Sequence, residues 1–262
     1  MHIVVCIKQV PEVSDVKVDP ETKTLVREGV PSILNPFDEY AVEEALRLKK
    51  KHGGEVTVIT MGPPQAREAL KKCLAMGADK AVLISDRKFA GADTLATSYT
   101  LSRAIAKMDF DIVFCGKQAI DGDTAQVGPQ LAEFLGIPQI TYVIKVEVDP
   151  EKKIVIAHRE TDDGYEVIKA KLPVLMTATK GLNEPRLPTV MGIMKASKKE
   201  IKVLTFEDLG GSEEDYGLKG SPTQVVDIFP PPVRAKGEKI IVEDPKEAAA
   251  KIIDFLIKRD LI

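Results

Sequence analysis

The chain has 262 residues, and its 37 Lys and Arg against 40 Asp and Glu leave a formal net charge of −3. With 44% hydrophobic residues, a chain of this length can bury a substantial core, as one large domain with an appendage or as two modest domains. The near balance of charge argues against a nucleic-acid-binding protein, in which a basic excess normally covers one face.

The first 136 residues alternate between strand and helix patterns. Short β-branched runs predict strands at 2–8, 55–60, 80–85 and 111–116. Amphipathic patterns predict one helix that begins at Asn35-Pro36, with Asn35 as its N-cap, and others at 63–76, 93–108 and 124–135. This alternation predicts an α/β fold in which helices cover both faces of a mostly parallel sheet.

The pattern changes after residue 138. Alternating runs at 139–148, 153–158 and 165–170 are joined by turn sequences, which predicts antiparallel strands attached to the parallel sheet. Residues 173–178 read as one more apolar strand. From 181 to 199 the chain mixes Pro, Gly and Met, which indicates an exposed loop leading into a short basic helix.

The C-terminal part lacks periodicity until its last helix. Residues 210–239 include GGSEEDYGLKGSP and FPPPVRAKGEK, which are typical of an extended arm. Asp244, Pro245 and Glu247 predict a new helix start, followed by an apolar face that must pack on its own sheet or on another chain. We therefore divide the chain into a domain at 1–205 and an extended arm with a C-terminal helix at 206–262.

The cysteines and histidines show no pattern typical of a metal or disulfide site. Cys6, Cys73 and Cys115 form no CxxC pair, and the three histidines have no ligand spacing to them. We therefore expect neither a metal nor a disulfide framework. No segment approaches the roughly 18 apolar residues of a membrane span, and the N-terminal apolar run is too short for a signal peptide. We expect a soluble, cytoplasmic protein without direct membrane insertion.

Motifs for side-chain catalysis are missing from the sequence. There is no nucleophile elbow, no P-loop and no HExxH, and no GxGxxG fingerprint follows the first strand. With only three histidines, a mechanism carried by side chains has little support. The sequence favours a protein that binds a cofactor and leaves the chemistry to it.

The segment after the strand at 111–116 is the strongest binding candidate. It leaves the carboxyl end of a buried strand and enters a helix that Asp123 or Thr124 is expected to cap. Open parallel sheets bind ligands at that edge, and the free N–H groups of a helix N-terminus favour phosphate. Residues 6–10, 35–38 and 61–62 meet the same edge and could enclose an adenine-sized pocket. A well-capped helix without a ligand is the simpler alternative.

Six motifs follow one another along the chain. They are NPFDEYAVEEALRLK at 35–49, CLAMGAD at 73–79, GKQAIDGDTAQVGPQ at 116–130, AHRETDDGYEVIKAKLPVLMTA at 157–178, LNEPR at 182–186 and GIMKASKK at 192–199. Together they resemble the β (small) subunit of an electron-transfer flavoprotein, and the resemblance covers essentially the whole chain.

The resemblance implies a Rossmann-like fold that binds an adenine nucleotide, and a heterodimer with an α subunit that carries FAD. The residues that correspond by position to the family's nucleotide site are Cys6, Asn35, Pro36, Phe37, Asp38, Met61, Gly116, Lys117, Gln118, Ala119, Ile120, Asp121, Gly122, Asp123, Thr124, Ala125, Gln126 and Val127. None of them is implied to be catalytic.

The bound nucleotide differs within the family. Conventional members hold a structural AMP, whereas electron-bifurcating members hold a second FAD that accepts a hydride from NADH and divides the two electrons between two acceptors. Conventional members tend to read D-D-D-C-N-Q-T in the loop, but this chain reads DGDTAQV at 121–127, which resembles the bifurcating group. Gly122 also allows the backbone to approach a bulky ligand. The resemblance therefore favours FAD over AMP, with NADH as a transient electron donor.

The resemblance also implies two interaction surfaces. Residues 181–199 match the loop with which the family docks partner proteins, such as an acyl-CoA-type dehydrogenase or a quinone reductase. Val190 and Met191 lie at its hydrophobic centre, and Lys195 belongs to its basic rim. In this family the arm and the last helix wrap the α subunit.

Three other functions compete with a bifurcating subunit. The first is a conventional β subunit with a structural AMP and no NADH oxidation. The second is a stand-alone adenine-nucleotide-binding stress-type protein. The third, an ATP-hydrolysing enzyme, is weakened by the missing phosphate-binding lysine loop.

Overall fold

The computed structural model describes residues 1–12, 31–227, 237, 239, 241–242 and 244–262. Its contacts divide the chain into two units, Met1–Asp227 and Ile228–Ile262, and each is described by itself. The strands are β1 (His2–Cys6), β2 (Gln9–Pro11), β3 (Ser32–Leu34), β4 (Glu55–Met61), β5 (Lys80–Ile84), β6 (Ile112–Gly116), β7 (Gln139–Asp149), β8 (Ile154–Thr161), β9 (Gly164–Lys171), β10 (Val174–Ala178) and β11 (Ile201–Leu204). The helices are α1 (Pro36–His52), α2 (Arg67–Met76), α3 (Thr94–Ile105), α4 (Val127–Leu135), α5 (Val190–Ala196), α6 (Phe206–Leu209) and α7 (Pro245–Ile257), with short 3₁₀ turns at Pro64–Ala66, Arg87–Phe89 and Glu213–Asp215.

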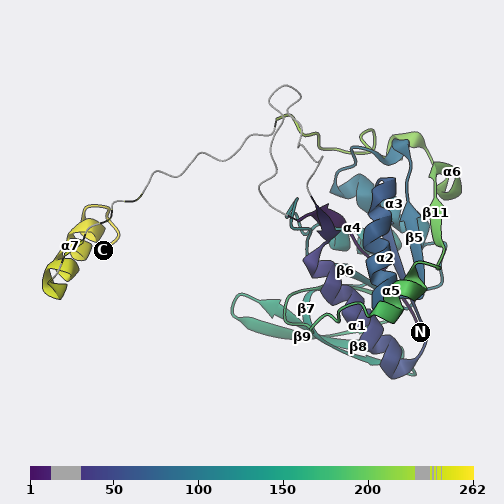
Figure 1. Ribbon diagram of the computed structural model, residues 1–262, viewed down its shortest axis with the longest axis horizontal. Helices are drawn as coiled ribbons and strands as arrows, with labels where there is room; N and C mark the ends of the chain where they lie inside the picture. The colour runs from purple at the N-terminus through teal and green to yellow at the C-terminus, as the bar shows by residue number, and fades with distance from the viewer. Residues whose placement is uncertain (13–30, 228–236, 238, 240, 243) are drawn as a thin grey trace. The chain divides into compact units, whose positions relative to one another are not determined.

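Nine strands of the first unit form one twisted sheet in the order β11-β5-β4-β1-β6-β10-β7-β8-β9 (Figure 1). The seven strands from β11 to β7 pair in parallel, and β8 and β9 are added antiparallel to them. The predicted α/β class and the added antiparallel strands are therefore confirmed. Strand β7 joins the parallel part of the sheet to the antiparallel part, because one of its edges pairs with β10 and the other with β8.

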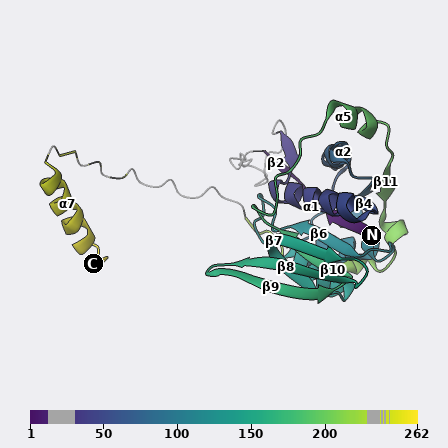
Figure 2. The same cartoon turned by 90° about the horizontal axis from the view of Figure 1, so that it is seen from below.

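Helices cover both faces of the parallel part. On one face α1 and α2 pack with Ile3 and Val5 of β1, and on the other α3 and α4 pack with Val4 and Cys6. Figure 2 shows α1 and α2 on one side of the sheet, with α5 beyond α2. The two faces alternate along β1 because successive side chains of a strand point to opposite sides.

Strand β1 lies at the centre, and the chain order reverses beside it. After β1 the chain adds β4 and β5 on one side, and it then returns to place β6 on the other side. The loops that follow β1 and β6 therefore leave the same edge of the sheet in opposite directions. Such a switch point opens a crevice at the carboxyl ends of the strands.

The predicted start of α4 differs from the structure. The helix expected at 124–135 begins only at Val127, because Asp123 and Ala125 have φ of 55° and 54°, which a helix does not accept. Its N-cap residue is Gln126, which makes no side-chain cap bond, rather than Asp123 or Thr124. Asn35 occupies the N-cap position of α1, as expected, but its side chain bonds elsewhere.

The first unit extends further along the chain than the predicted boundary after residue 205. An unpredicted strand, β11, pairs with β5 at the edge of the sheet. After it, Leu209 and Tyr216 are both 1% exposed and join the core between α3 and the sheet. The boundary at 205 is therefore too early, since 22 further residues, 206–227, belong to the compact unit.

In the second unit the predicted C-terminal helix is present as α7, with Asp244 as its N-cap. The Asp244 carboxylate accepts a hydrogen bond from the backbone N–H of Lys246, and Pro245 occupies the first turn. Ile252, Ile253 and other apolar side chains of α7 are exposed within the chain. The middle of the predicted arm, 228–236, lies outside the described residues.

Candidate functional site

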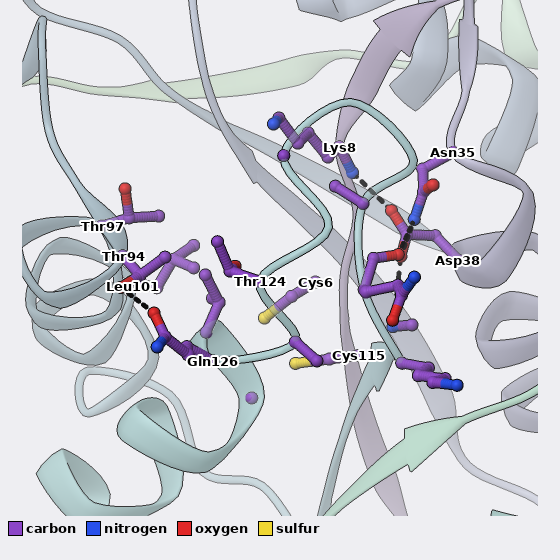
Figure 3. A pocket seen from close by; sticks show the side chains of 18 of the residues that line it. Cys6, Lys8, Asn35, Asp38, Thr94, Thr97, Leu101, Cys115, Thr124 and Gln126 are labelled. Carbon is purple, nitrogen blue, oxygen red and sulfur yellow. Dashed lines mark hydrogen bonds between the residues drawn. The ribbon is translucent and has the colours of Figure 1, made fainter. Parts of the chain in front are cut away.

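A cleft with a volume of about 360 Å³ lies at the switch point between β1 and β6 (Figure 3). Its lining comes from the ends of β1, β4 and β6, the start of α1, the loop between β6 and α4 with the first residues of α4, and residues 92–101 at the start of α3 and within it. The residues that line it are Cys6, Ile7, Lys8, Asn35, Asp38, Met61, Ala92, Asp93, Thr94, Thr97, Leu101, Cys115, Gly116, Lys117, Gln118, Ala119, Gly122, Asp123, Thr124, Ala125, Gln126, Val127 and Gly128. Such a cleft is a candidate ligand site because open α/β sheets bind ligands at this position.

Asp38, in the first turn of α1, holds the two loops of the cleft together. Its Oδ2 accepts the backbone N–H of Lys8 at 2.7 Å, after β1, and its Oδ1 accepts that of Gly116 at 3.1 Å, at the end of β6. The side chain of Asn35 donates a third bond to Oδ1 at 2.9 Å. Burial raises the pKa of Asp38 to about 7, although these three donors favour its ionised form. The carboxyl group therefore titrates close to neutral pH.

Asn35 extends the same network into the loop after β6. Besides its bond to Asp38, its Nδ2 donates to the carbonyl oxygen of Gln118 at 2.9 Å, and its Oδ1 accepts the N–H of Ile120 at 3.3 Å. The side chain is 1% exposed, so its bonds fix the loop from within. The motif at 35–38 thus positions the cleft rather than only starting a helix.

The loop between β6 and α4 presents its backbone to the cleft. The left-handed conformations of Asp123 and Ala125 turn the chain twice before α4 begins. Among the described residues, the N–H groups of residues 124–128 have no protein acceptor. Three of these five groups, at the N-cap residue 126 and at residues 127 and 128 of α4, lie where the helix dipole is positive. This arrangement is typical of a phosphate-binding helix N-terminus.

Two glycines allow the close approaches that shape this loop. A Cβ on Gly116 would lie 2.2 Å from Asp38 Oδ1, and a Cβ on Gly128 would lie 2.6 Å from Thr177 Cγ2. No atom lies within 4 Å of a Cβ built on Gly122. Gly116 and Gly128 are therefore required by packing, whereas Gly122 borders open space in the cleft.

The two lysines that line the cleft, Lys8 and Lys117, both have partners in the protein. Lys8 Nζ lies 2.7 Å from Asp121 Oδ1, so that this ion pair spans the two loops. Lys117 Nζ lies 4.9 Å from the ring centroid of Tyr142. Because both cations of the lining are occupied, the backbone N–H groups are the main unsatisfied donors of the cleft.

Asp93 ties the rim of the cleft to the end of the first unit. Its Oδ1 caps α3 through the N–H groups of Leu95 and Ala96, and its Oδ2 accepts from Thr223 Oγ1 at 2.8 Å. Its own N–H donates to Ser221 Oγ at 2.8 Å. Burial opposes ionisation, but the hydrogen bonds from Ala96 and Thr223 outweigh it and hold the pKa of Asp93 below its usual value.

Most of the residues expected from the sequence line the cleft, but four do not. Pro36 and Phe37 belong to the first turn of α1 behind Asp38, Ile120 is 41% exposed, and Asp121 bonds to Lys8 across the loops. Sequence reasoning missed one wall entirely, which α3 provides through Ala92, Asp93, Thr94, Thr97 and Leu101. The sequence contains a signal for this wall, since the helix expected at 93–108 begins with Asp93, a typical N-cap residue, after the predicted strand at 80–85.

Gln126 connects this missed wall to the loop. Its Oε1 accepts a hydrogen bond from Thr94 Oγ1 at 2.9 Å, which joins the N-terminus of α3 to that of α4. Figure 3 shows Thr94, Thr97 and Gln126 on the side of the cleft opposite Lys8 and Asn35. The cleft therefore has a polar wall on each side and sulfur-bearing Cys6 and Cys115 between them.

The segment at 181–199 is pinned to the helices beneath it. Arg186 forms a two-bond ion pair with the buried Glu43 of α1, with Nε and Nη2 at 2.7 and 3.0 Å from its oxygens. Asn183 donates to Glu44 at 3.0 Å. A Cβ on Gly192 would lie 2.3 Å from the carbonyl oxygen of Ala75, so α5 packs directly on α2. The motifs at 35–49, 73–79, 182–186 and 192–199 therefore meet in one place.

The outer side of this segment carries an exposed apolar surface. Val190 is 75% exposed and Met191 63% exposed, and Leu187, Ile193 and Met194 are exposed beside them. Lys195 is also exposed at the end of α5. Exposed apolar side chains on a rigidly held helix are typical of a protein-docking surface. The sequence identified its centre but not the contribution of Leu187.

The described residues offer little for metal or membrane chemistry. Within them, no three His, Cys, Asp or Glu side chains gather in a way that could hold a metal ion. None of the helices among these residues combines the length and apolar character needed to cross a bilayer.

The chain is similar to members of one family over essentially its whole length. The model of the electron transfer flavoprotein domain matches residues 22–209. The electron transfer flavoprotein subunit beta of Thermoanaerobacterium thermosaccharolyticum is 57% identical and covers 100% of both chains. The caffeyl-CoA reductase-Etf complex subunit CarD of Acetobacterium woodii is 52% identical over 100% of both chains. Protein FixA of Azotobacter vinelandii is 49% identical over 95% of this chain and 92% of its own.

Proposed function

We propose a function for this chain from one established premise: it belongs to the electron transfer flavoprotein family and is a β subunit of it, which takes part in electron transfer. We infer that the cleft at the switch point binds FAD, with the adenine nucleotide half inside the cleft. The observation that carries this inference is the row of unpaired N–H groups at residues 124–128, in the lining of a switch-point cleft.

The residues present fit a nucleotide of this kind. Phosphate groups suit the N–H donors at the start of α4, where the helix dipole adds roughly 0.3–1 kcal/mol per charge. Since the lysines of the lining are engaged by Asp121 and Tyr142, the backbone is expected to hold the phosphates. The volume of about 360 Å³ lies near the lower end of roughly 300–1,000 Å³ for ligand sites. A cleft of this volume would hold the adenine nucleotide half of FAD.

Each part of the cleft has its own task in this proposal. Asp38 and Asn35 hold the loops after β1 and β6 at a fixed separation. Thr94 and Gln126 join α3 to α4 and close the side of the cleft. Gly122 leaves open space beside the backbone for a bulky ligand. The chemistry that FAD supplies when bound is acceptance of a hydride from NADH and division of the two electrons between two acceptors.

The choice of FAD over AMP is tested by counting flavins. We expect the purified heterodimer to release two FAD molecules and no AMP when it is denatured. The sequence DGDTAQV at 121–127, with Gly122 beside open space, supports this expectation. One FAD together with one AMP per heterodimer would instead establish the conventional β subunit and remove NADH oxidation from the proposal.

We propose two protein partners for the chain. The first is an electron transfer flavoprotein α subunit, which the exposed apolar side chains of α7 would contact. The second is a dehydrogenase of the acyl-CoA type or a quinone reductase, which would dock on Val190, Met191 and Lys195. The name of the CarD relative, which places that protein in a caffeyl-CoA reductase-Etf complex, supports a CoA-ester enzyme as the partner. We further propose that the complex works in the cytoplasm.

A further inference from the structure

Two cysteine thiols lie side by side in the wall of the cleft. Cys6 ends β1 and Cys115 lies in β6, and the two residues are register partners in the parallel pairing of these strands. Neighbouring strands lie about 4.8 Å apart, and register partners point to the same face of the sheet. Both residues belong to the same core cluster on one face of the sheet, and both line the cleft. Figure 3 shows both sulfur atoms on the side of the cleft where Thr124 and Gln126 lie.

This pair has no structural task that would require sulfur. It is not a disulfide, since all three cysteines are free. The neighbouring Cys6 thiol and burial together hold the pKa of Cys115 well above the usual range. Cys115 is therefore a neutral thiol, which reacts poorly as a single nucleophile. The pair remains suited to a ligand that takes both sulfur atoms at once.

We propose that Cys6 and Cys115 form a dithiol site for soft, thiol-bridging ligands of the trivalent arsenical class, in the wall of the cleft. A site of this kind needs two sulfur atoms within reach of one atom, and the adjacent strands provide them. With phenylarsine oxide, each thiol gives up a proton, two As–S bonds form, and the arsenic-bound oxygen leaves as one water molecule. No oxidation state changes, so no further reactant is required.

The position of Cys6 and Cys115 in the cleft predicts competition between the arsenical and the nucleotide. Because both sulfur atoms line the volume that the nucleotide would occupy, the arsenical and the nucleotide are expected to exclude each other. This second part rests on the proposed function, whereas the dithiol itself does not. Cys73 provides a matched comparison, since it is 0% exposed in α2 and does not line the cleft.

The test uses the full-length chain, phenylarsine oxide and intact-mass measurement. We expect one arsenical per chain, which survives excess monothiol and is removed by a dithiol. Cys6→Ala and Cys115→Ala should each lose the adduct, and Cys73→Ala should keep it, with circular dichroism confirming the fold of each variant. Absence of an adduct on the unmodified chain, or an equal adduct on Cys6→Ala, would overturn the proposal.

A second measurement needs no variant and covers the event that one fails to fold. The arsenical-treated chain is unfolded and alkylated, and the peptides are identified by mass. Protection of Cys6 and Cys115 with alkylation of Cys73 supports the dithiol, and any other pair contradicts it. Saturating FAD or AMP should slow uptake by at least tenfold. Unchanged uptake would count against nucleotide binding in this cleft while leaving the dithiol intact.

Discussion

Asp38 joins the strand ends of the cleft with a carboxyl group whose pKa is about 7, against 3.8 in its ordinary environment. Since the folded chain binds this proton more tightly than the unfolded chain, the proton stabilises the fold at low pH. The stabilisation is complete below about pH 4 and is lost as the pH rises through about 7. The shift corresponds to roughly 4 kcal/mol, at about 1.36 kcal/mol for each pKa unit.

We expect Asp38→Asn to remove this dependence on pH. The unfolding free energies of the unmodified chain and of the variant are measured by urea denaturation between pH 5 and pH 8. The unfolding free energy of the unmodified chain minus that of Asp38→Asn should fall by a few kcal/mol from pH 5 to pH 8. Only the unmodified chain loses a bound proton over this interval. Subtraction cancels the other titrating groups. A difference that stays constant with pH would show that Asp38 does not titrate there.

Asn35 shows what local sequence reveals about a residue and what it hides. The pattern Asn-Pro-x-Asp predicts a helix start, and α1 begins at Pro36. The partners of the Asn35 side chain in the loop after β6 lie 83 and 85 residues away, at Gln118 and Ile120. Nothing in a single sequence pairs such distant positions, so the residue was assigned the common role of a cap.

At the scale of the element, Gly128 fixes the contact between α4 and β10. The Cβ of an alanine would lie 2.6 Å from Thr177 Cγ2, and Thr177 has little freedom to turn because its Oγ1 accepts the N–H of Tyr142 at 2.9 Å. We expect Gly128→Ala to lower the unfolding free energy by about 1–3 kcal/mol. Gly122→Ala is the control, and it should change stability by less than about 0.5 kcal/mol because its Cβ meets no atom within 4 Å. Equal effects in urea denaturation would contradict this account.

The helix α5 presents the exposed side chain of Val190 to a docking partner in the proposed function. Val190→Ala removes an exposed apolar side chain from a helix that is held by Gly192 against α2. We expect the affinity for the proposed partner dehydrogenase to fall at least about fivefold, as at an interface anchor, with flavin content unchanged. Val203→Ala, on the edge strand β11 and 38% exposed, is the matched control. Docking that responds equally to both substitutions would place the partner elsewhere.

The sequence predicts some helices and strands accurately and others not. Strong periodicity located the strands β1, β4, β5 and β6 within one or two residues. The start of α4 was misplaced because positive φ at Asp123 and Ala125 has no signature in residues other than glycine. Strand β11 was missed because it has only four residues, and only its two ends are buried. Its pairing with β5 is a tertiary contact, which local patterns do not encode.

At the scale of the whole molecule, residues 206–227 complete the first unit. The ring of Tyr216 packs against Tyr99, Phe89 and Phe206 with centroid distances of 5.2, 5.3 and 5.4 Å, and its hydroxyl donates to the carbonyl oxygen of Gly210 at 2.6 Å. The Gly and Pro residues of this stretch predict an extended arm. Composition alone does not reveal that one aromatic side chain of the stretch, Tyr216, is buried in the core. The two possible boundaries lead to different truncated proteins.

A chain that ends at Asp227 keeps the Tyr216 cluster, whereas a chain that ends at Thr205 exposes Phe89 and Tyr99. We expect the longer fragment to unfold in urea with nearly the free energy of the first unit in the full chain. The shorter fragment should lose at least about 3–5 kcal/mol, the usual cost of deleting one large buried aromatic side chain. Tyr216→Ala in the full chain should reproduce most of that loss, since it removes the same ring without shortening the chain. If both fragments were equally stable, residues 206–227 would not belong to the core, and the boundary would return to residue 205.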